Sequence, residues 1–268
     1  MLEAVVRPQS AKAALSSLGG RYSAVLAGGT LLLPEVNAGT SALKTLVSLD
    51  RSGLSAIRIA NGKVALGAMV RLAEIEEDDR LASLHPVVRA IGGPVLRNSA
   101  TVGGNLFAPA PYGDLATAFV ALDATATIES AAGTRSVKVE DFLAERHKAD
   151  EIVTAVRFAL PSPGSLHFHK AMRRAQNSAA IVTVAAHIEL ESGRVKRARI
   201  ALGGVGSYAL RSPSAEAALK GQTLDAATVM QAGEVARRDI KPVDDAYASA
   251  WYRRQVLPVH LRRALLGD

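Results

Sequence analysis

The order of hydrophobic and polar positions predicts a mixed fold in which short strands alternate with short helices. Within residues 1–50, Ser10 can cap a helix over 11–18, because the small and unbranched residues of that segment favour a helix. Short apolar runs at 25–27 and 45–49 follow, and each is predicted to be a strand. This part of the chain is therefore expected to run strand, helix, strand.

Two turn signals predict antiparallel hairpins. Asn61 and Gly62 separate the apolar runs 57–59 and 64–66, and both residues tolerate a positive φ. The segment 191–194, Glu-Ser-Gly-Arg, joins two longer apolar runs in the same way. These longer runs are predicted to be strands over 180–190 and 195–203.

Helices are predicted at 72–79, 86–91 and 114–122. The last of these begins with Asp114, and a carboxylate in the first turn of a helix is stabilised by the helix dipole. The chain after residue 214 is expected to be mainly helical. Its last part carries one apolar stripe at helical spacing, made of Leu257, Leu261 and Leu265.

A break in the pattern at 160–164 predicts a domain boundary. The sequence there is Leu-Pro-Ser-Pro-Gly, and it follows an alternating strand at 151–160. We therefore expect two α+β domains, one over residues 1–160 and one over residues 165–268.

Composition limits the class of protein. The chain has 268 residues, of which 49% are hydrophobic, so it can bury a sizeable core and is not a disordered segment. No run approaches the roughly 18 apolar residues of a membrane-spanning helix, and the N-terminus lacks the profile of a secretory signal, so a cytoplasmic protein is expected. Cysteine is absent, which excludes disulfides, a thiolate nucleophile and a cysteine-ligated iron–sulfur cluster within this chain.

The net charge of +7 raises the question of nucleic-acid binding. The basic residues form short pairs, such as Arg173-Arg174 and Arg262-Arg263, and aromatic residues make up only 4% of the chain, too few for a base-stacking surface. We therefore expect no nucleic-acid partner, and a basic surface that docks an acidic partner or is solvated.

Two glycine turns are the strongest candidates for a binding site. Gly28-Gly29-Thr30 and Gly103-Gly104-Asn105 each follow a short apolar run, although the dinucleotide fingerprint G-x-G-x-x-G is absent around the second turn. Together they could offer the backbone N–H groups of an anion-binding nest to a diphosphate from two sides. Asp114 could accept a hydrogen bond from a ribose or ribityl hydroxyl. Plain turns, and a helix-capping role for Asp114, remain open at this point.

No catalytic or metal-binding residue is predicted in this chain. His167 and His169 share a face if their segment is a strand, but no third ligand nearby completes a zinc site. The nucleophile motif G-x-S-x-G is absent as well. Cofactor binding is therefore favoured over hydrolysis.

An ordered set of segments resembles one family, the FAD-binding medium subunits of the molybdenum hydroxylases, to which xanthine dehydrogenase and carbon monoxide dehydrogenase belong. Before the predicted boundary these segments are AGGTLLLP (27–34), LRNSATVGGNL (96–106) and ALDA (121–124). After it they are KAMRRAQNSAAIVTVAAHIEL, ARIALGGVG, AEAALKG and ASAWYRRQVLPVHLRRAL. The resemblance thus spans nearly the whole chain in order.

The resemblance implies an α+β fold class: a two-subdomain FAD-binding domain of the vanillyl-alcohol oxidase and p-cresol methylhydroxylase type, followed by an α+β domain like the C-terminal domain of the carbon monoxide dehydrogenase flavoprotein. The two subdomains would cover about 1–50 and 51–160. It also implies which residues contact FAD. The two turns would bind the diphosphate, Asp114 a ribityl or ribose hydroxyl, and Ile152 and Lys170 outer parts of the nucleotide. The diphosphate residues are Ala27, Gly28, Gly29, Thr30 and Leu31, and Thr101, Val102, Gly103, Gly104 and Asn105.

The resemblance also implies partners. A large subunit would hold molybdopterin and a small subunit two [2Fe-2S] clusters, in a dimer of heterotrimers, with electrons passing through FAD to NAD+, a quinone or another acceptor. Asn177-Ser178 stands where relatives often carry an aromatic residue that shields the isoalloxazine, so Phe107 or Tyr112 is expected to shield it instead, or that face is open. A free-standing flavin oxidase and a scaffold without FAD are the alternatives, and the substrate of the complex is left open.

Overall fold

The computed structural model describes residues 2–145, 150–174 and 177–267. The chain forms two compact units, each assembled from three segments. The first unit contains 1–79, 94–108 and 124–159, and the second contains 80–93, 109–123 and 160–268. Within the described ranges, no helix is both long enough and apolar enough to cross a membrane.

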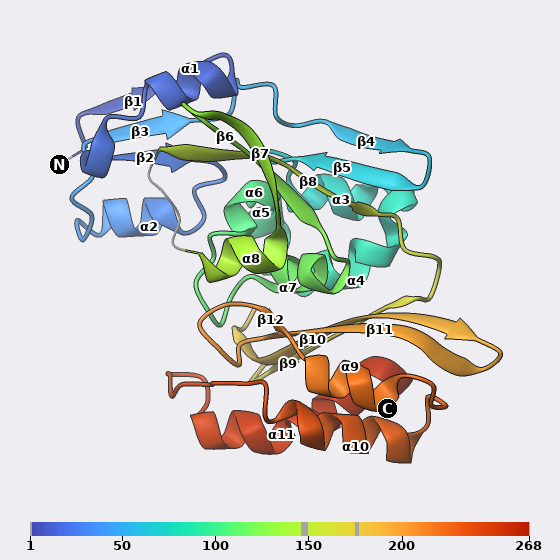
Figure 1. The fold of residues 1–268 in the computed structure, drawn as a ribbon. Helices are drawn as coiled ribbons and strands as arrows, with labels where there is room; N and C mark the ends of the chain where they lie inside the picture. Colours follow the sequence, from blue (N-terminus) through green and yellow to red (C-terminus); the bar gives the residue numbers. More distant parts are fainter. Residues whose placement is uncertain (1, 146–149, 175–176, 268) are drawn as a thin grey trace. The chain divides into compact units, whose positions relative to one another are not determined.

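The first unit begins with a small parallel sheet, in the order β1-β3-β2 (Figure 1). Ser10 caps the helix that follows β1 as predicted, since its Oγ accepts a hydrogen bond from Ala13 N at 3.1 Å. Val47 and Leu49 are buried against Ala14, so the helix packs on the sheet through its small residues. The elements are β1 (Ala4–Val6), α1 (Ala11–Ser16), the 3-10 helix η1 (Gly20–Tyr22), β2 (Ser23–Leu26), α2 (Leu32–Asn37) and β3 (Thr45–Ser48).

A five-stranded antiparallel sheet, in the order β4-β5-β8-β6-β7, forms the rest of the first unit together with short helices. The predicted hairpin between β4 and β5 is confirmed, because Asn61 and Gly62 have φ values of 51° and 68°. The elements are β4 (Ile57–Ala60), β5 (Lys63–Gly67), α3 (Leu72–Glu77), α5 (Pro94–Arg97), α6 (Val102–Asn105), β6 (Thr125–Ser130), β7 (Gly133–Lys138), α8 (Val139–Ala144) and β8 (Glu151–Ala159).

The second unit is built on a four-stranded antiparallel sheet, in the order β12-β11-β10-β9 (Figure 1). Its predicted hairpin is also confirmed: Ser192 and Gly193 turn the chain with φ values of 51° and 75°. The strands are β9 (Leu166–Met172), β10 (Ala180–Glu191), β11 (Arg194–Gly203) and β12 (Leu210–Arg211). The helices are η2 (Asp79–Leu84), α4 (His85–Arg89), α7 (Asp114–Ala121), α9 (Pro213–Leu219), α10 (Ala226–Ala236) and α11 (Ala250–Leu266).

Helices cover both faces of this second sheet. Helix α7 lies on one face against β10 and β11, and α9 and α11 pack on the other face (Figure 1). The predicted apolar stripe of the last helix is confirmed, since Leu257, Leu261 and Leu265 are all buried in the core of this unit. At Gly203 the sheet approaches α7 so closely that a Cβ would lie 2.6 Å from Thr117 Oγ1.

One difference from the predicted elements lies in the second glycine segment. The sequence there, rich in Gly and Pro, favours a loop, yet α6 forms over Val102–Asn105. Thr101 caps this short helix through its Oγ, which accepts a hydrogen bond from Gly104 N at 3.1 Å. The cap supplies a local hydrogen bond that offsets the low helix propensity of the two glycines.

A pair of histidines joins β9 to α11. The imidazole rings of His169 and His260 stack with centroids 5.1 Å apart, and Nε2 of the first lies 3.0 Å from Nδ1 of the second. Burial, His169 and Arg263 together lower the pKa of His260 from 6.5 to about 4. Among the residues that the structure describes, no group of three or more His, Asp or Glu is placed to hold a metal ion.

The histidine pair predicts a loss of stability in acid. Because the pKa of His260 is lower in the folded chain than in the unfolded chain, the folded state binds fewer protons between about pH 4 and pH 6.5. The contribution of His260 to the free energy of unfolding should therefore be complete above pH 6.5, and it should be lost as the pH is lowered toward 4. Urea unfolding at a series of pH values tests this, and His260→Gln should reduce the slope. An unchanged slope in that variant would contradict the assignment.

Candidate functional site

The first glycine turn presents open backbone donors. It follows β2 and leads into α2, and Gly29 adopts a φ of 72° that favours glycine. Among the hydrogen bonds of the described residues, none is donated by the backbone N–H of Gly28, Gly29, Thr30 or Leu31. A run of four amides without a protein acceptor is the arrangement that binds an anion through backbone dipoles. The turn therefore has the donor set that a diphosphate requires.

The second glycine segment lies directly against the first. A Cβ on Gly28 would stand 2.0 Å from the carbonyl oxygen of Ser99 and 3.1 Å from Cα of Ala100. A Cβ on Gly104 would stand 3.8 Å from Cβ of Ala27. Two segments far apart in the sequence are thus brought together within the first unit.

The second turn does not supply the open amides that the sequence interpretation expects from it. The backbone N–H groups of α6 already have acceptors within the protein: Val102 donates to Val70 O, Gly103 to Ala68 O, Gly104 to Thr101 Oγ1 and Asn105 to Thr101 O. The reason for glycine is also different at Gly103, where a Cβ would lie 2.8 Å from Cβ of Ala68. This turn therefore serves close packing beside the first turn.

Asp114 and Lys170, two predicted nucleotide contacts, form a buried ion pair in the second unit. Lys170 Nζ lies 2.8 Å from Asp114 Oδ2 and 2.9 Å from the carbonyl oxygen of Ala90, and the side chains of the pair are each 5% exposed. Thr183 Oγ1 donates to Asp114 Oδ1 at 2.7 Å. No pattern in the sequence indicates Thr183, because its role depends on the packing of segments distant in the chain.

The ion pair leaves Asp114 able to bind a further donor. An ionised carboxylate has about four acceptor positions, and Lys170 and Thr183 use two of those on Asp114. A hydroxyl of a nucleotide could therefore be added without displacing either partner. The reading of Asp114 as the start of a helix is confirmed at the same time, because it is the first residue of α7.

Ile152 and Val102 can contact a ligand only through their backbones. The side chain of Ile152, on β8, is buried with Val47 and Leu49 in the core of the first unit. Val102 is buried in the same unit. Leu31, by contrast, is 40% exposed at the edge of the first turn.

The two aromatic candidates have different surroundings. Phe107, in the first unit, packs edge-on against Phe142 with ring centroids 5.6 Å apart. Tyr112, in the second unit, is 44% exposed, and its hydroxyl lies 2.8 Å from that of Tyr247. Asn177 has a φ of 51°, while residues 175–176 lie outside the described ranges.

Comparison with known proteins covers both parts of the chain. A family model described as "FAD binding domain in molybdopterin dehydrogenase" matches residues 2–162. A second model, "CO dehydrogenase flavoprotein C-terminal domain", matches residues 167–267.

Two similar curated proteins are subunits of dehydrogenases. The "6-hydroxypseudooxynicotine dehydrogenase complex subunit alpha" of Paenarthrobacter nicotinovorans is 31% identical over 92% of this chain and 87% of its own length. The "Glyceraldehyde dehydrogenase medium chain" of Sulfolobus acidocaldarius is 29% identical over 97% of this chain and 95% of its own length.

Solved structures share the fold along the whole chain. A chain of the carbon monoxide dehydrogenase from Hydrogenophaga pseudoflava superposes with a TM-score of 0.93 at 26% identity, and the match covers 99% of this chain and 96% of that one. For a chain of quinoline 2-oxidoreductase from Pseudomonas putida 86, the TM-score is 0.90 at 28% identity, with 100% and 96% covered.

Proposed function

Because this chain belongs to the family of FAD-binding medium subunits of molybdenum hydroxylases, we propose that it is the FAD-carrying, electron-transferring subunit of an oxidoreductase complex. The predicted α+β fold class, an FAD-binding domain followed by a domain of the carbon monoxide dehydrogenase flavoprotein type, is confirmed. Bound FAD would supply the redox chemistry that moves electrons from the [2Fe-2S] clusters of a small subunit to NAD+, a quinone or another acceptor.

The first glycine turn carries this proposal. Its four amides without a protein acceptor would hold the diphosphate, and the contact of Gly28 with Ser99 would fix their directions. The segment from Ala27 to Leu31 would line one side of the diphosphate and donate to it. The segment from Thr101 to Asn105 would line the other side by close packing, since the amides of 102–105 already have acceptors within the protein. Asp114 would accept a hydrogen bond from a ribityl or ribose hydroxyl.

The proposal gives Lys170 and Ile152 less direct contacts with the nucleotide. Lys170 would act on the nucleotide mainly by holding the Asp114 carboxylate in place, since its Nζ already has two partners. Ile152 would contribute its backbone, because its side chain is in the core. No residue of this chain needs to act as a general acid or base.

The proposal includes the other members of the complex. A large molybdopterin subunit and a small [2Fe-2S] subunit would assemble with this chain in the cytoplasm, as a dimer of heterotrimers. Support comes from the names of relatives, which describe a medium chain and a complex subunit. Affinity purification of the tagged full-length chain from its own cells should recover both partners, and particle mass should match two heterotrimers. Recovery of this chain alone with FAD would favour a free-standing oxidase.

The FAD site is tested by adding a charge beside the first turn. Gly104→Asp would place a carboxylate next to Ala27, where it should repel the diphosphate, so the flavin absorption bands of the purified chain should disappear. Gly104→Ala adds the same Cβ, 3.0 Å from Thr101 Oγ1, without the charge, and should retain FAD.

Gly19→Asp provides the matched charge control for this test. No atom lies within 4 Å of a Cβ at that position, so the charge is added in open space and FAD should be retained. A colourless unmodified chain that does not take up added FAD would contradict the proposed function. Equal loss of FAD in Gly104→Ala and Gly104→Asp would show that packing, and not charge, explains the effect.

A further inference from the structure

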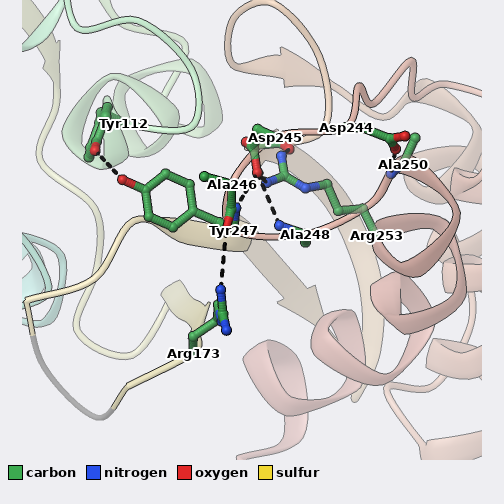
Figure 2. Close-up of polar contacts among 10 residues, drawn as sticks. Tyr112, Arg173, Asp244, Asp245, Ala246, Tyr247, Ala248, Ala250 and Arg253 are labelled. Atoms are coloured by element: carbon green, nitrogen blue, oxygen red, sulfur yellow. Dashed lines mark hydrogen bonds and ion pairs between the residues drawn. The ribbon is translucent and has the colours of Figure 1, made fainter.

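A buried arginine fixes the segment 244–249, which precedes α11 in the second unit (Figure 2). Arg253 is 2% exposed, and its Nη2 lies 2.8 Å and 2.7 Å from the two carboxylate oxygens of Asp245. Its Nη1 donates to the carbonyl oxygen of Gly204. A guanidinium held by three acceptors in the protein interior has little freedom, so the carboxylate that it binds is fixed as well.

The fixed carboxylate orders the backbone on both sides of Tyr247. Asp245 Oδ1 accepts hydrogen bonds from Tyr247 N at 2.8 Å and from Ala248 N at 3.0 Å. Arg173 Nη1 donates to the carbonyl oxygen of Ala246 at 3.2 Å (Figure 2). The backbone at Tyr247, from which its ring extends, is therefore fixed by contacts that do not involve the ring.

Tyr247 in turn holds Tyr112. The two hydroxyl oxygens are 2.8 Å apart, and the rings meet edge to face with centroids 6.4 Å apart and an interplanar angle of 81° (Figure 2). Tyr112 is also held through its backbone, because its N–H donates to Pro109 O at 2.8 Å. Although it is restrained at both ends, its side chain stays 44% exposed.

Tyr112 lies close in the chain to Asp114, a proposed nucleotide contact. It precedes Asp114 by two residues, and it lies in the loop that leads from α6 to α7. A tyrosine ring that is restrained but left exposed offers a flat apolar surface at a small cost in conformational entropy. Asn177-Ser178 provides no aromatic ring for the flavin.

We infer that Tyr112 packs against the isoalloxazine of bound FAD and that Tyr247 is the residue that positions it. This inference rests on the proposed function. In this arrangement Arg253 and Asp245 act on the cofactor only through Tyr247, so all three are positioning residues. Phe107, the other aromatic candidate, lies in the first unit, is 47% exposed and packs edge-on against Phe142, but it has no hydroxyl through which a neighbour could position it.

The hydrogen bond between the tyrosines can be tested without FAD. The Tyr247 hydroxyl and partial burial raise the pKa of Tyr112 above its ordinary value of 10.0. Tyr247→Phe keeps the ring and removes the hydroxyl, so the pKa of Tyr112 should fall back toward 10.0 in an ultraviolet titration of tyrosinate. An unchanged titration of Tyr112 in that variant would overturn the positioning role.

The contact with flavin is tested by the fluorescence of the FAD-loaded full chain. A tyrosine beside an isoalloxazine quenches its emission by donating an electron to the excited ring, and phenylalanine does not. Tyr112→Phe should therefore raise the emission per bound flavin several-fold. Tyr247→Phe should raise it less, because the Tyr112 phenol is retained but loosened. Tyr252→Phe, which removes a hydroxyl on α11, is the matched control and should leave the emission unchanged.

The outcomes separate this inference from the proposed function. If Tyr112→Phe binds FAD normally with unchanged emission, the contact is wrong and the proposed function stands. If Tyr112→Phe responds and Tyr247→Phe matches the unmodified chain, the contact stands and the positioning role of Tyr247 is wrong. If the unmodified chain binds no FAD, the proposed function and this inference both fail.

Discussion

Gly28→Ala is expected to destabilise the first unit by about 3 kcal/mol or more and to abolish FAD binding. The added Cβ would lie 2.0 Å from the carbonyl oxygen of Ser99, which is backbone and cannot rotate away as a side chain would. The two glycine segments would have to separate, and this would also reorient the four amides of the first turn. Urea unfolding followed by fluorescence, together with flavin absorption, measures both effects.

Gly19→Ala is the control for this substitution. Gly19 has a φ of −104°, and no atom lies within 4 Å of a Cβ there, so alanine should change the free energy of unfolding by less than about 0.5 kcal/mol. Gly103→Ala should fall between the two, because its Cβ would meet the Cβ of Ala68 at 2.8 Å. If Gly28→Ala is as stable as Gly19→Ala, the close approach to Ser99 is incorrect.

Asp114→Asn is expected to destabilise the second unit by about 3–5 kcal/mol, because it leaves the Lys170 ammonium buried without its counter-charge. FAD affinity should fall as well, since the amide offers one oxygen acceptor where the carboxylate offers two. Chemical unfolding of the full chain and titration with FAD measure the two effects separately.

A double-mutant cycle with Lys170→Met tests the cause of this loss. Removing both charges should recover part of the stability lost in either single variant, because no buried charge is left unpaired. Glu3→Gln is the exposed control. The side chains of Glu3 and Lys44 are 62% and 53% exposed, so breaking that ion pair should leave the free energy of unfolding nearly unchanged. Equal losses in Asp114→Asn and Glu3→Gln would contradict the buried pair.

The local elements of this fold could be predicted from the sequence because their causes are local. The Ser10 cap and the hairpins at Asn61-Gly62 and 191–194 each depend on the φ values or hydrogen bonds of a few adjacent residues. The family could be predicted as well, because its glycine turns and C-terminal segments occur in order along the chain. The helix α6 was missed, because the cap that stabilises it outweighs a composition that favours a loop.

The candidate site could be predicted only in part. The sequence indicated both glycine turns, but not that the amides of α6 donate to Val70, Ala68 and Thr101 within the protein. It indicated Asp114 and, by resemblance, Lys170, but not that they are each other's partners across 56 positions of the chain. These contacts depend on the packing of distant segments, which residue patterns do not encode.

The second unit is formed by segments from both parts of the chain, and this limits how such chains can be recombined. Helix α7, from Asp114 to Ala121, is buried at every position against strands that follow residue 160, although it lies within the part matched by the FAD-binding family model. A chimaera joined at residue 160 would therefore bring α7 from one parent onto the sheet of the other, and Asp114 onto a foreign β9. Exchange of the two parts between relatives should succeed only where α7 and that sheet are exchanged together.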